Sequence, residues 1–173
     1  MLVKILGSIL ILASTTYMGY KKSLKYKRRP TQIRELQACF HMVENEISYL
    51  ESIITDIFNK IAESNKSIIS DIFSRTAEII NAGNVTGAAK AWETSVTEKA
   101  DTTCLNKEDI EILKSFGKLL GTTDKEGQLS NIALTLHQLK NQEVKAEEEK
   151  RKNGMLYTRL GIMAGAAVVI MIF

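Results

Sequence analysis

Apolar residues form two long runs at the ends of the 173-residue chain, with periodic patterns between them. In the central part they recur in steps of three and four residues, which places side chains on one face of an α-helix. One proline, ten glycines and few aromatic residues disfavour an all-β fold with its many turns. We therefore predict an all-α protein. Its antiparallel bundle of about six helices would be flanked by N- and C-terminal transmembrane helices.

The first apolar run, residues 1–20, predicts an N-terminal transmembrane anchor, because its length approaches the roughly 20 residues that cross a bilayer. A cleaved signal peptide would carry its positive charge before the apolar run, whereas here most of the charge follows it. Six basic residues lie in the juxtamembrane segment, residues 21–30: Lys21, Lys22, Lys25, Lys27, Arg28 and Arg29. The positive-inside rule then leaves the N-terminus outside and the next segment in the cytosol.

This basic cluster could set the membrane topology and contact anionic lipid, or it could bind nucleic acid. It lies beside the predicted membrane segment, has only Tyr26 as an aromatic neighbour and continues into no basic face. We therefore predict a membrane contact and no nucleic-acid partner.

The clearest helical periodicity covers residues 31–61. Nine apolar positions follow an a/d heptad: Ile33, Leu36, Phe40, Val43, Ile47, Leu50, Ile54, Ile57 and Ile61. The residues alone favour one unbroken helix that starts at Pro30-Thr31, since no glycine or later proline interrupts it. Such a helix could form a dimeric coiled coil. The spacing also fits two helices of an antiparallel bundle, with a turn near Ser52 to Thr55.

Shorter amphipathic helices complete the predicted bundle, residues 31–140. Trp92 lies on an apolar stripe and is expected in the core, and Gly117 in mid-helix indicates the close approach of a neighbouring helix. Asn106 is expected to cap its helix. Gly121 is expected as a left-handed C-cap, and Thr123 with Glu126 fits a capping box.

A polar helical stalk, residues 141–154, leads to the last apolar segment, residues 155–173. Starting at Met155, with Arg159 reaching toward the interface, the segment is long enough to cross a bilayer. Basic residues before it keep that side cytosolic. Gly161 and Gly165 form a GxxxG motif, which indicates either a transmembrane helix–helix contact or ordinary small residues facing lipid.

The sequence contains no nucleotide-binding glycine motif, no H-E-x-x-H and no C-x-x-C. His41 and His137 are expected to face solvent, and the spacing of Cys39 and Cys104 gives no disulfide framework. We therefore predict no catalytic, cofactor-binding or metal-binding residues, and no enzyme activity.

Several short motifs occur in order along nearly the whole chain: Arg29-Pro30, Glu44-x-Glu46-Ile47-x-Tyr49, Ala91-Trp92, Leu120-Gly121-x-x-Asp124-x-x-x-Gln128 and Leu156-Tyr157-x-x-Leu160-Gly161. Together they resemble the stage III sporulation protein AB family of endospore-forming bacteria. The segment that contains Asp124 and Gln128 is the most specific of them, so these two residues are candidate partner contacts. For Asp124 a structural role in the capping turn is the alternative, and the one we favour. The resemblance also implies that the heptad is two helices, as in the helical-bundle domain of type II secretion F proteins.

The resemblance implies a non-enzymatic inner-membrane platform subunit of the sporulation channel complex between mother cell and forespore. Such a protein would cross the cell membrane twice, with both termini outside and the bundle in the cytosol. Its expected partners are other membrane proteins of the complex, a cytosolic secretion-type ATPase and, as a homo-oligomer, further copies of itself. The alternative is a membrane-anchored, dimeric coiled-coil signalling or regulatory protein.

Overall fold

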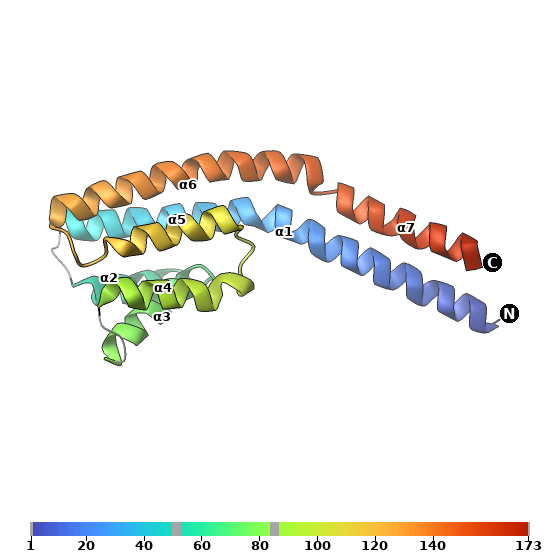
Figure 1. The fold of residues 1–173 in the computed structure, drawn as a ribbon, viewed down its shortest axis with the longest axis horizontal. Helices are drawn as coiled ribbons and strands as arrows, with labels where there is room; N and C mark the ends of the chain where they lie inside the picture. The colour runs from blue at the N-terminus through green and yellow to red at the C-terminus, as the bar shows by residue number, and fades with distance from the viewer. Residues whose placement is uncertain (1, 50–52, 84–86, 173) are drawn as a thin grey trace. The chain divides into compact units, whose positions relative to one another are not determined.

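The computed structural model describes residues 2–49, 53–83 and 87–172, with the side chains of all of these except residues 2–6, 8, 9 and 172 (Figure 1). The described residues form helices and no strand, so the predicted all-α class is confirmed. The helices are α1 (Leu2–Tyr49), α2 (Ile54–Ser64), α3 (Ser70–Asn81), α4 (Ala88–Lys99), α5 (Lys107–Lys118), α6 (Lys125–Asn153) and α7 (Leu156–Ile172), with a 3₁₀ turn at Ala100–Thr102.

The chain divides into two compact units. The central unit is Thr31–Val144, and the terminal unit contains the chain up to Pro30 and from Lys145 onward. Helices α1 and α6 therefore each contribute to both units.

Helix α1 corrects the prediction that a helix starts at Pro30, because Pro30 lies inside a helix that begins at Leu2. Proline removes one backbone hydrogen bond from a helix interior. Residues on both sides of it are buried within their own units: Ser23 in the terminal unit and Ile33 in the central unit.

The heptad is divided between α1 and α2, as the family resemblance implied, and the unbroken helix favoured by its periodicity is wrong. Helix α1 ends at Tyr49, and Ile53 has an extended backbone, with φ −66° and ψ 139°, before α2 begins at Ile54. The predicted turn near Ser52 to Thr55 falls partly on residues 50–52, which lie outside the described residues.

Five aromatic side chains form the centre of the central unit: Phe40, Phe58, Phe73, Trp92 and Phe116. Their neighbouring ring centroids lie 4.8–6.2 Å apart, mostly in edge-to-face arrangements, the geometry that aromatic pairs prefer. They come from α1, α2, α3, α4 and α5, so one cluster holds five helices together.

Trp92 is fully buried, as predicted, and its indole Nε1–H donates to the carbonyl oxygen of Leu113 at 2.7 Å. The ring lies against Gly117, where an added Cβ would overlap the Cδ1 atom of the indole and lie 3.1 Å from its Cγ atom. The close helix approach inferred from Gly117 is therefore confirmed, and α4 and α5 meet at this glycine.

Glu143 joins α6 to α1 within the central unit. Its carboxylate accepts hydrogen bonds from Lys140 at 2.9 Å, from Arg34 at 2.7 Å and from Gln37 at 3.2 Å. These donors, Lys140 first, lower the pKa of Glu143 from 4.5 to about 2. A carboxylate held in this way stabilises the folded state above its unfolded pKa, and this stability is lost as the pH falls toward the folded pKa.

Replacement of Gly117 by alanine should destabilise the bundle. The added methyl group overlaps Trp92, and overpacking of about 1–3 kcal/mol outweighs the helix-propensity gain of about 1 kcal/mol. Urea unfolding of the full chain in mild detergent, followed by the fluorescence of Trp92, should show a lower midpoint for Gly117→Ala. Ser115→Ala, at an exposed position of the same helix, is the control and should leave the midpoint unchanged. An unchanged midpoint for Gly117→Ala would contradict the described contact.

Replacement of Glu143 by glutamine should reduce the acid sensitivity of the protein. The wild-type chain should lose stability as the pH falls from about 4.5 to about 2, since the lowered pKa of Glu143 belongs to the folded state only. Glu143→Gln should be less stable at neutral pH and should show a shallower decline over that window. Glu148→Gln, an exposed position of the same helix, is the control. Urea midpoints measured across the window check this, and equal slopes in all three proteins would refute it.

Candidate functional site

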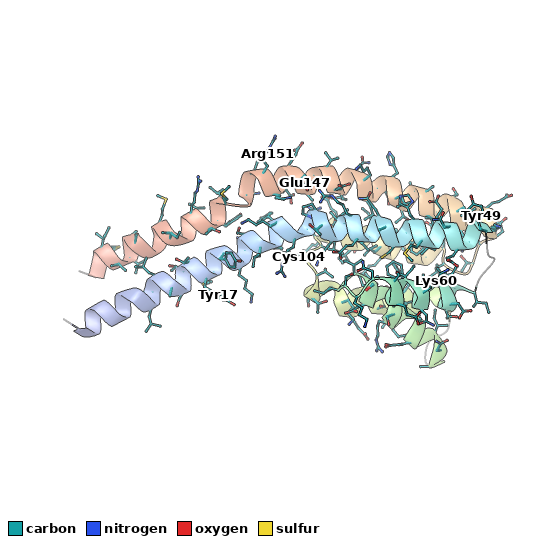
Figure 2. The ribbon with its side chains drawn as sticks, turned by 180° about the vertical axis from the view of Figure 1, so that it is seen from behind. Tyr17, Tyr49, Lys60, Cys104, Glu147 and Arg151 are labelled. Atoms are coloured by element: carbon teal, nitrogen blue, oxygen red, sulfur yellow. The ribbon has the colours of Figure 1, made fainter. Side chains whose placement is uncertain are left out.

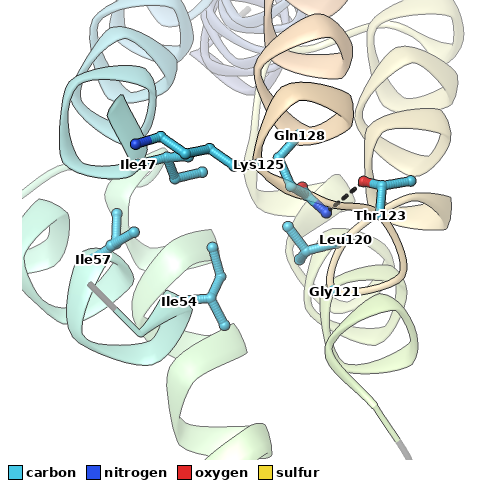
Figure 3. A pocket seen from close by; sticks show the side chains of 8 residues that line it. All are labelled: Ile47, Ile54, Ile57, Leu120, Gly121, Thr123, Lys125 and Gln128. Carbon is cyan, nitrogen blue, oxygen red and sulfur yellow. Dashed lines mark hydrogen bonds between the residues drawn. The ribbon is translucent and has the colours of Figure 1, made fainter. Parts of the chain in front are cut away.

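One apolar groove lies within the central unit, where the end of α1, the start of α2 and the turn between α5 and α6 come together (Figure 3). Its volume is about 290 Å³. Four aliphatic side chains line it: Ile47, Ile54, Ile57 and Leu120. Figure 3 shows Ile54 and Ile57 on one side of the groove and Leu120 on the other, so residues distant in sequence form its walls.

The turn that carries Leu120 depends on Gly121. Helix α5 ends at Lys118, and Gly121 has a φ of +77°, which L-residues with a side chain rarely adopt. The left-handed glycine predicted at this position is therefore confirmed. It lets the chain reverse between α5 and α6 with Leu120 buried beside the groove.

The predicted capping box of Thr123 and Glu126 is wrong by one residue. The backbone N–H of Gly127 donates to Oδ1 of Asp124 at 2.9 Å, so Asp124 caps α6, which begins at Lys125. A carboxylate is favourable at a helix N-terminus because of the helix dipole. The hydroxyl of Thr123 instead accepts a hydrogen bond from the side chain of Gln128 at 2.9 Å.

Gln128 forms the polar part of the groove wall. Its side chain is 9% exposed, and its Nε2 group donates to the carbonyl oxygen of Leu119 at 2.7 Å as well as to Thr123. Because a carbonyl can only accept, this bond fixes which end of the amide is nitrogen. The other end, Oε1, is buried and accepts no hydrogen bond from any residue that the structure describes. An unsatisfied buried acceptor costs about 1–3 kcal/mol.

Two residues follow the groove residue Ile47 at the end of α1, Ser48 and Tyr49. The ammonium group of Lys125 donates to the carbonyl oxygen of Ser48 at 2.9 Å. Tyr49, the last residue of α1, is 82% exposed. It is labelled in Figure 2. Apolar and polar surface therefore meet at this end of the central unit.

Of the sequence-predicted candidates Asp124 and Gln128, only Gln128 is among the residues that line this groove. Gln128 lines it, whereas the role seen for Asp124 is that of the helix cap. Their contact with a partner stays a prediction. Sequence reasoning missed Ile47, Ile54 and Ile57 as groove residues because heptad spacing predicts only that they face a core.

The other predicted pair, Gly161 and Gly165, lies against α1 within the terminal unit. A Cβ atom added at Gly161 would lie 2.7 Å from the carbonyl oxygen of Thr15, and one at Gly165 would overlap the hydroxyl of Thr15. Gly19 faces them from α1, where a Cβ would lie 2.5 Å from the carbonyl oxygen of Tyr157. The two backbones thus approach more closely than a side chain would allow. The sequence offered no signal for Gly19, because pairing between distant segments requires the fold.

Polar contacts continue the pairing beyond these glycines. Ser23 donates to the carbonyl oxygen of Gly154, and the rings of Tyr26 and Tyr157 stack 5.4 Å apart. The ammonium group of Lys22 lies 4.5 Å from the centre of the Tyr157 ring, a cation–π contact. These contacts set the register of α1 against the C-terminal segment of the same unit.

The predicted basic cluster divides into two groups. Lys21, Lys22, Lys25, Lys27 and Arg28 are exposed. Arg29 is buried and forms an ion pair with Glu149 at 2.7 Å. Arg29 therefore has a structural contact in addition to any effect on topology, which the sequence did not indicate.

Among the residues searched, one helical stretch, which lies within Lys125–Met171, is long and apolar enough to cross a membrane by length and composition. The C-terminal apolar segment belongs to it. The predicted N-terminal span is not seen by this criterion, and the side chains of residues 1–6, 8 and 9 lie outside the described ones. The N-terminal anchor therefore stays a prediction.

The model of one protein family, stage III sporulation protein AB, matches residues 4–173. The stage III sporulation protein AB of Bacillus subtilis (strain 168) is 33% identical over 171 residues, which is 99% of each chain. A solved structure of a stage III sporulation protein AB has a TM-score of 0.67 and 34% identity, and it covers 72% of this chain and 98% of its own.

The chain belongs to the stage III sporulation protein AB family.

A role in sporulation follows from this membership. The family description names no catalytic activity, and the described part of the chain holds no group of three or more His, Cys, Asp or Glu residues suited to a metal ion. Burial, together with the nearby Glu35 carboxylate, raises the pKa of the Cys39 thiol to about 12. That thiol is therefore protonated at neutral pH and is a poor nucleophile. The groove is thus the strongest candidate site of this family member.

Replacement of Asp124 by alanine should destabilise the chain by about 0.5–2 kcal/mol, the usual cost of removing an N-cap. Asp124→Asn should keep most of the stability, because asparagine caps equally well. Glu126→Ala should change little, although a Thr123–Glu126 capping box would make it costly. Urea unfolding followed by Trp92 fluorescence distinguishes these outcomes. A larger loss of stability for Glu126→Ala than for Asp124→Ala would instead support the capping box of Thr123 and Glu126.

Proposed function

We propose that this chain is a non-enzymatic inner-membrane platform subunit of the sporulation channel complex between mother cell and forespore. The central unit would provide the cytosolic docking surface for a secretion-type ATPase and for membrane partners. One observation carries the proposal: the same chain combines an open apolar groove with a terminal unit whose large apolar side chains face outward. The similarity of the central bundle to type II secretion F proteins is part of this proposal.

The terminal unit supports membrane insertion through its residue pattern. Leu10, Met18, Met163 and Ile170 are 63–76% exposed, while Gly165 is buried at the helix contact. Small residues inside and large apolar residues outside are favoured in lipid, where the surroundings are as apolar as the side chains themselves. The same pattern on α1 and α7 supports two spans.

The charges beside the terminal apolar segments support the orientation. Lys21, Lys25, Lys27 and Arg28 follow the N-terminal run, and Arg151 and Lys152 precede the C-terminal one; all are exposed. By the positive-inside rule, both basic groups belong in the cytosol and both termini outside. The proposed location is the mother-cell, or outer forespore, membrane.

The coiled-coil alternative is not favoured. Ile33, Leu36, Phe40 and Val43 from the heptad are all fully buried within their own chain. A dimeric coiled coil would need these a/d side chains to face a partner helix. A homo-oligomer through another surface stays a prediction.

Co-purification of the tagged full chain from sporulating cells tests the proposal. We expect to recover other membrane proteins of the channel complex and the cytosolic secretion-type ATPase, because a platform holds several partners at once. Ile54→Ser, in the groove, should reduce ATPase recovery at least severalfold. Leu134→Ser, at an exposed apolar position of α6, should not.

Two results would count against the platform. One is a chain recovered without membrane partners from cells that express the whole complex. The other is equal ATPase recovery with Ile54→Ser and the wild type, which would move docking away from the groove. Membrane fractionation of each variant confirms that the protein is still inserted.

A further inference from the structure

A second apolar hollow, which we call the α1–α7 cleft, lies beside the helix pair of the terminal unit. Its volume is about 590 Å³, and five residues of α1 and one of α7 line it: Leu12, Ala13, Thr16, Tyr17, Tyr20 and Thr158. From Leu12 to Tyr20 the cleft follows α1 for about 12 Å, at about 1.5 Å per residue. That length is a little less than half of the roughly 30 Å hydrocarbon core. The cleft therefore fits the depth of one leaflet.

The walls of the cleft do not suit a further transmembrane helix. Helices pack closely in lipid through small residues, and Gly19, Gly161 and Gly165 are already used in the contact between α1 and α7. The cleft instead has two large aromatic residues, Tyr17 at 64% exposed and Tyr20 at 48% exposed. A flexible chain can lie between such side chains where a rigid helix cannot. A lipid acyl chain therefore matches the cleft better than a partner helix does.

Positive charge begins where the cleft ends. Residues four apart lie on the same side of a helix, so the row from Ala13 to Tyr17 continues to Lys21 and then to Lys25. Both lysines are exposed. No acidic residue precedes Glu35 in the sequence. Like charges four residues apart repel each other, so an anion between the two lysines is favourable.

The tyrosines place this end of the cleft at the membrane surface. Tyrosine is enriched where the hydrocarbon core meets the headgroups, and Tyr20 directly precedes Lys21. Along α1 the order is therefore an apolar stretch, a tyrosine rim and a pair of ammonium groups. An anionic phospholipid presents the complementary order, an acyl chain below a negatively charged headgroup.

We propose that the α1–α7 cleft binds one anionic phospholipid, with an acyl chain along Leu12 to Tyr20 and the headgroup between the ammonium groups of Lys21 and Lys25. This is more than a diffuse attraction of basic residues to the membrane surface, because it specifies one lipid, one cleft and two lysines. The inference rests on the proposed function in one respect only, the insertion of α1 and α7 into the membrane.

Native mass spectrometry of the full chain, purified in a neutral detergent, tests the inference. Phosphatidylglycerol is the probe, and phosphatidylcholine with the same acyl chains is the control without net charge. We expect one phosphatidylglycerol molecule to be retained per chain, with an affinity at least about fivefold above that of phosphatidylcholine. Fivefold is about the effect of a single lysine beside anionic lipid, so two lysines make it a lower bound.

Charge-matched variants separate a defined site from general positive charge. Lys21→Gln combined with Lys25→Gln should reduce the preference for phosphatidylglycerol at least severalfold. Arg151→Gln combined with Lys152→Gln removes the same charge from exposed positions of α6, a helix that does not line the cleft. This control should keep the preference of the wild type.

A second pair of variants tests the acyl contact. Ala13→Leu fills part of the cleft and should weaken the binding of both lipids while preserving their ratio. Ala164→Leu adds the same side chain at an exposed position of α7 that does not line the cleft, and it should weaken neither. Circular dichroism checks the helix content of every variant; if Ala13→Leu loses helix, the lysine variants still decide.

Several results would overturn the inference. Equal retention of the two lipids would remove selection by the lysines, and an equal loss in the α6 control would assign the preference to general charge. A broad series of lipid adducts without a favoured single one would leave only ordinary lipid around the helices. A dimer that Ala13→Leu abolishes would assign the cleft to a second copy of the chain.

The outcome is distinguishable from failure of the platform proposal. If phosphatidylglycerol shows no preference but the channel proteins still co-purify, the lipid inference fails and the platform stands. If phosphatidylglycerol is retained as expected but no channel protein co-purifies, the lipid site stands and the platform fails.

Discussion

The contact between the Trp92 ring and Gly117 determines the geometry on which the groove depends. Only a glycine lets α5 approach the indole so closely. The Nε1–H of Trp92 also donates to the carbonyl oxygen of Leu113, which lies one helical turn before Gly117 in α5. Helix α5 ends one residue after Gly117. The carbonyl of Leu119, which accepts from Gln128, and the side chain of Leu120 are thus positioned from the aromatic core. A shift of α5 against α4 would move one wall of the groove with it.

Much of the central unit follows from its sequence because burial and periodicity agree there. Trp92, Gly117 and the Asn106 cap all lie where local pattern and local chemistry indicate. The break after Tyr49 does not follow, since no glycine or proline marks it and only the family resemblance implied it. At Pro30 the sequence predicted a helix start, whereas the structure has a continuous helix. Its local preference for a helix start gave way to the packing of the helix on both sides.

The site was predictable in part. The resemblance singled out Asp124 and Gln128, of which Gln128 lines the groove. Neither the groove nor the unsatisfied Oε1 could be foreseen, because each depends on three segments that meet only in the fold. The capping error has a local cause. Thr123 and Asp124 are both good N-cap residues, and in the structure Asp124 caps α6 while the hydroxyl of Thr123 accepts from Gln128.

The two units obey opposite packing rules along one continuous polypeptide. In the central unit the largest apolar side chains are buried and carboxylates such as Glu143 are held at its edge. In the terminal unit Met163 and Ile170 point outward while Gly161 and Gly165 meet Thr15 and Gly19. Water drives the first arrangement through the hydrophobic effect. In the lipid environment that we propose for it, the terminal unit would have no such driving force and would depend on close backbone contact. Helices α1 and α6 each contribute residues to both units. The kind of side chain that is buried therefore differs between the two parts of each helix. Arg29 and Pro30 are the last two residues of α1 that belong to the terminal unit, and both are buried.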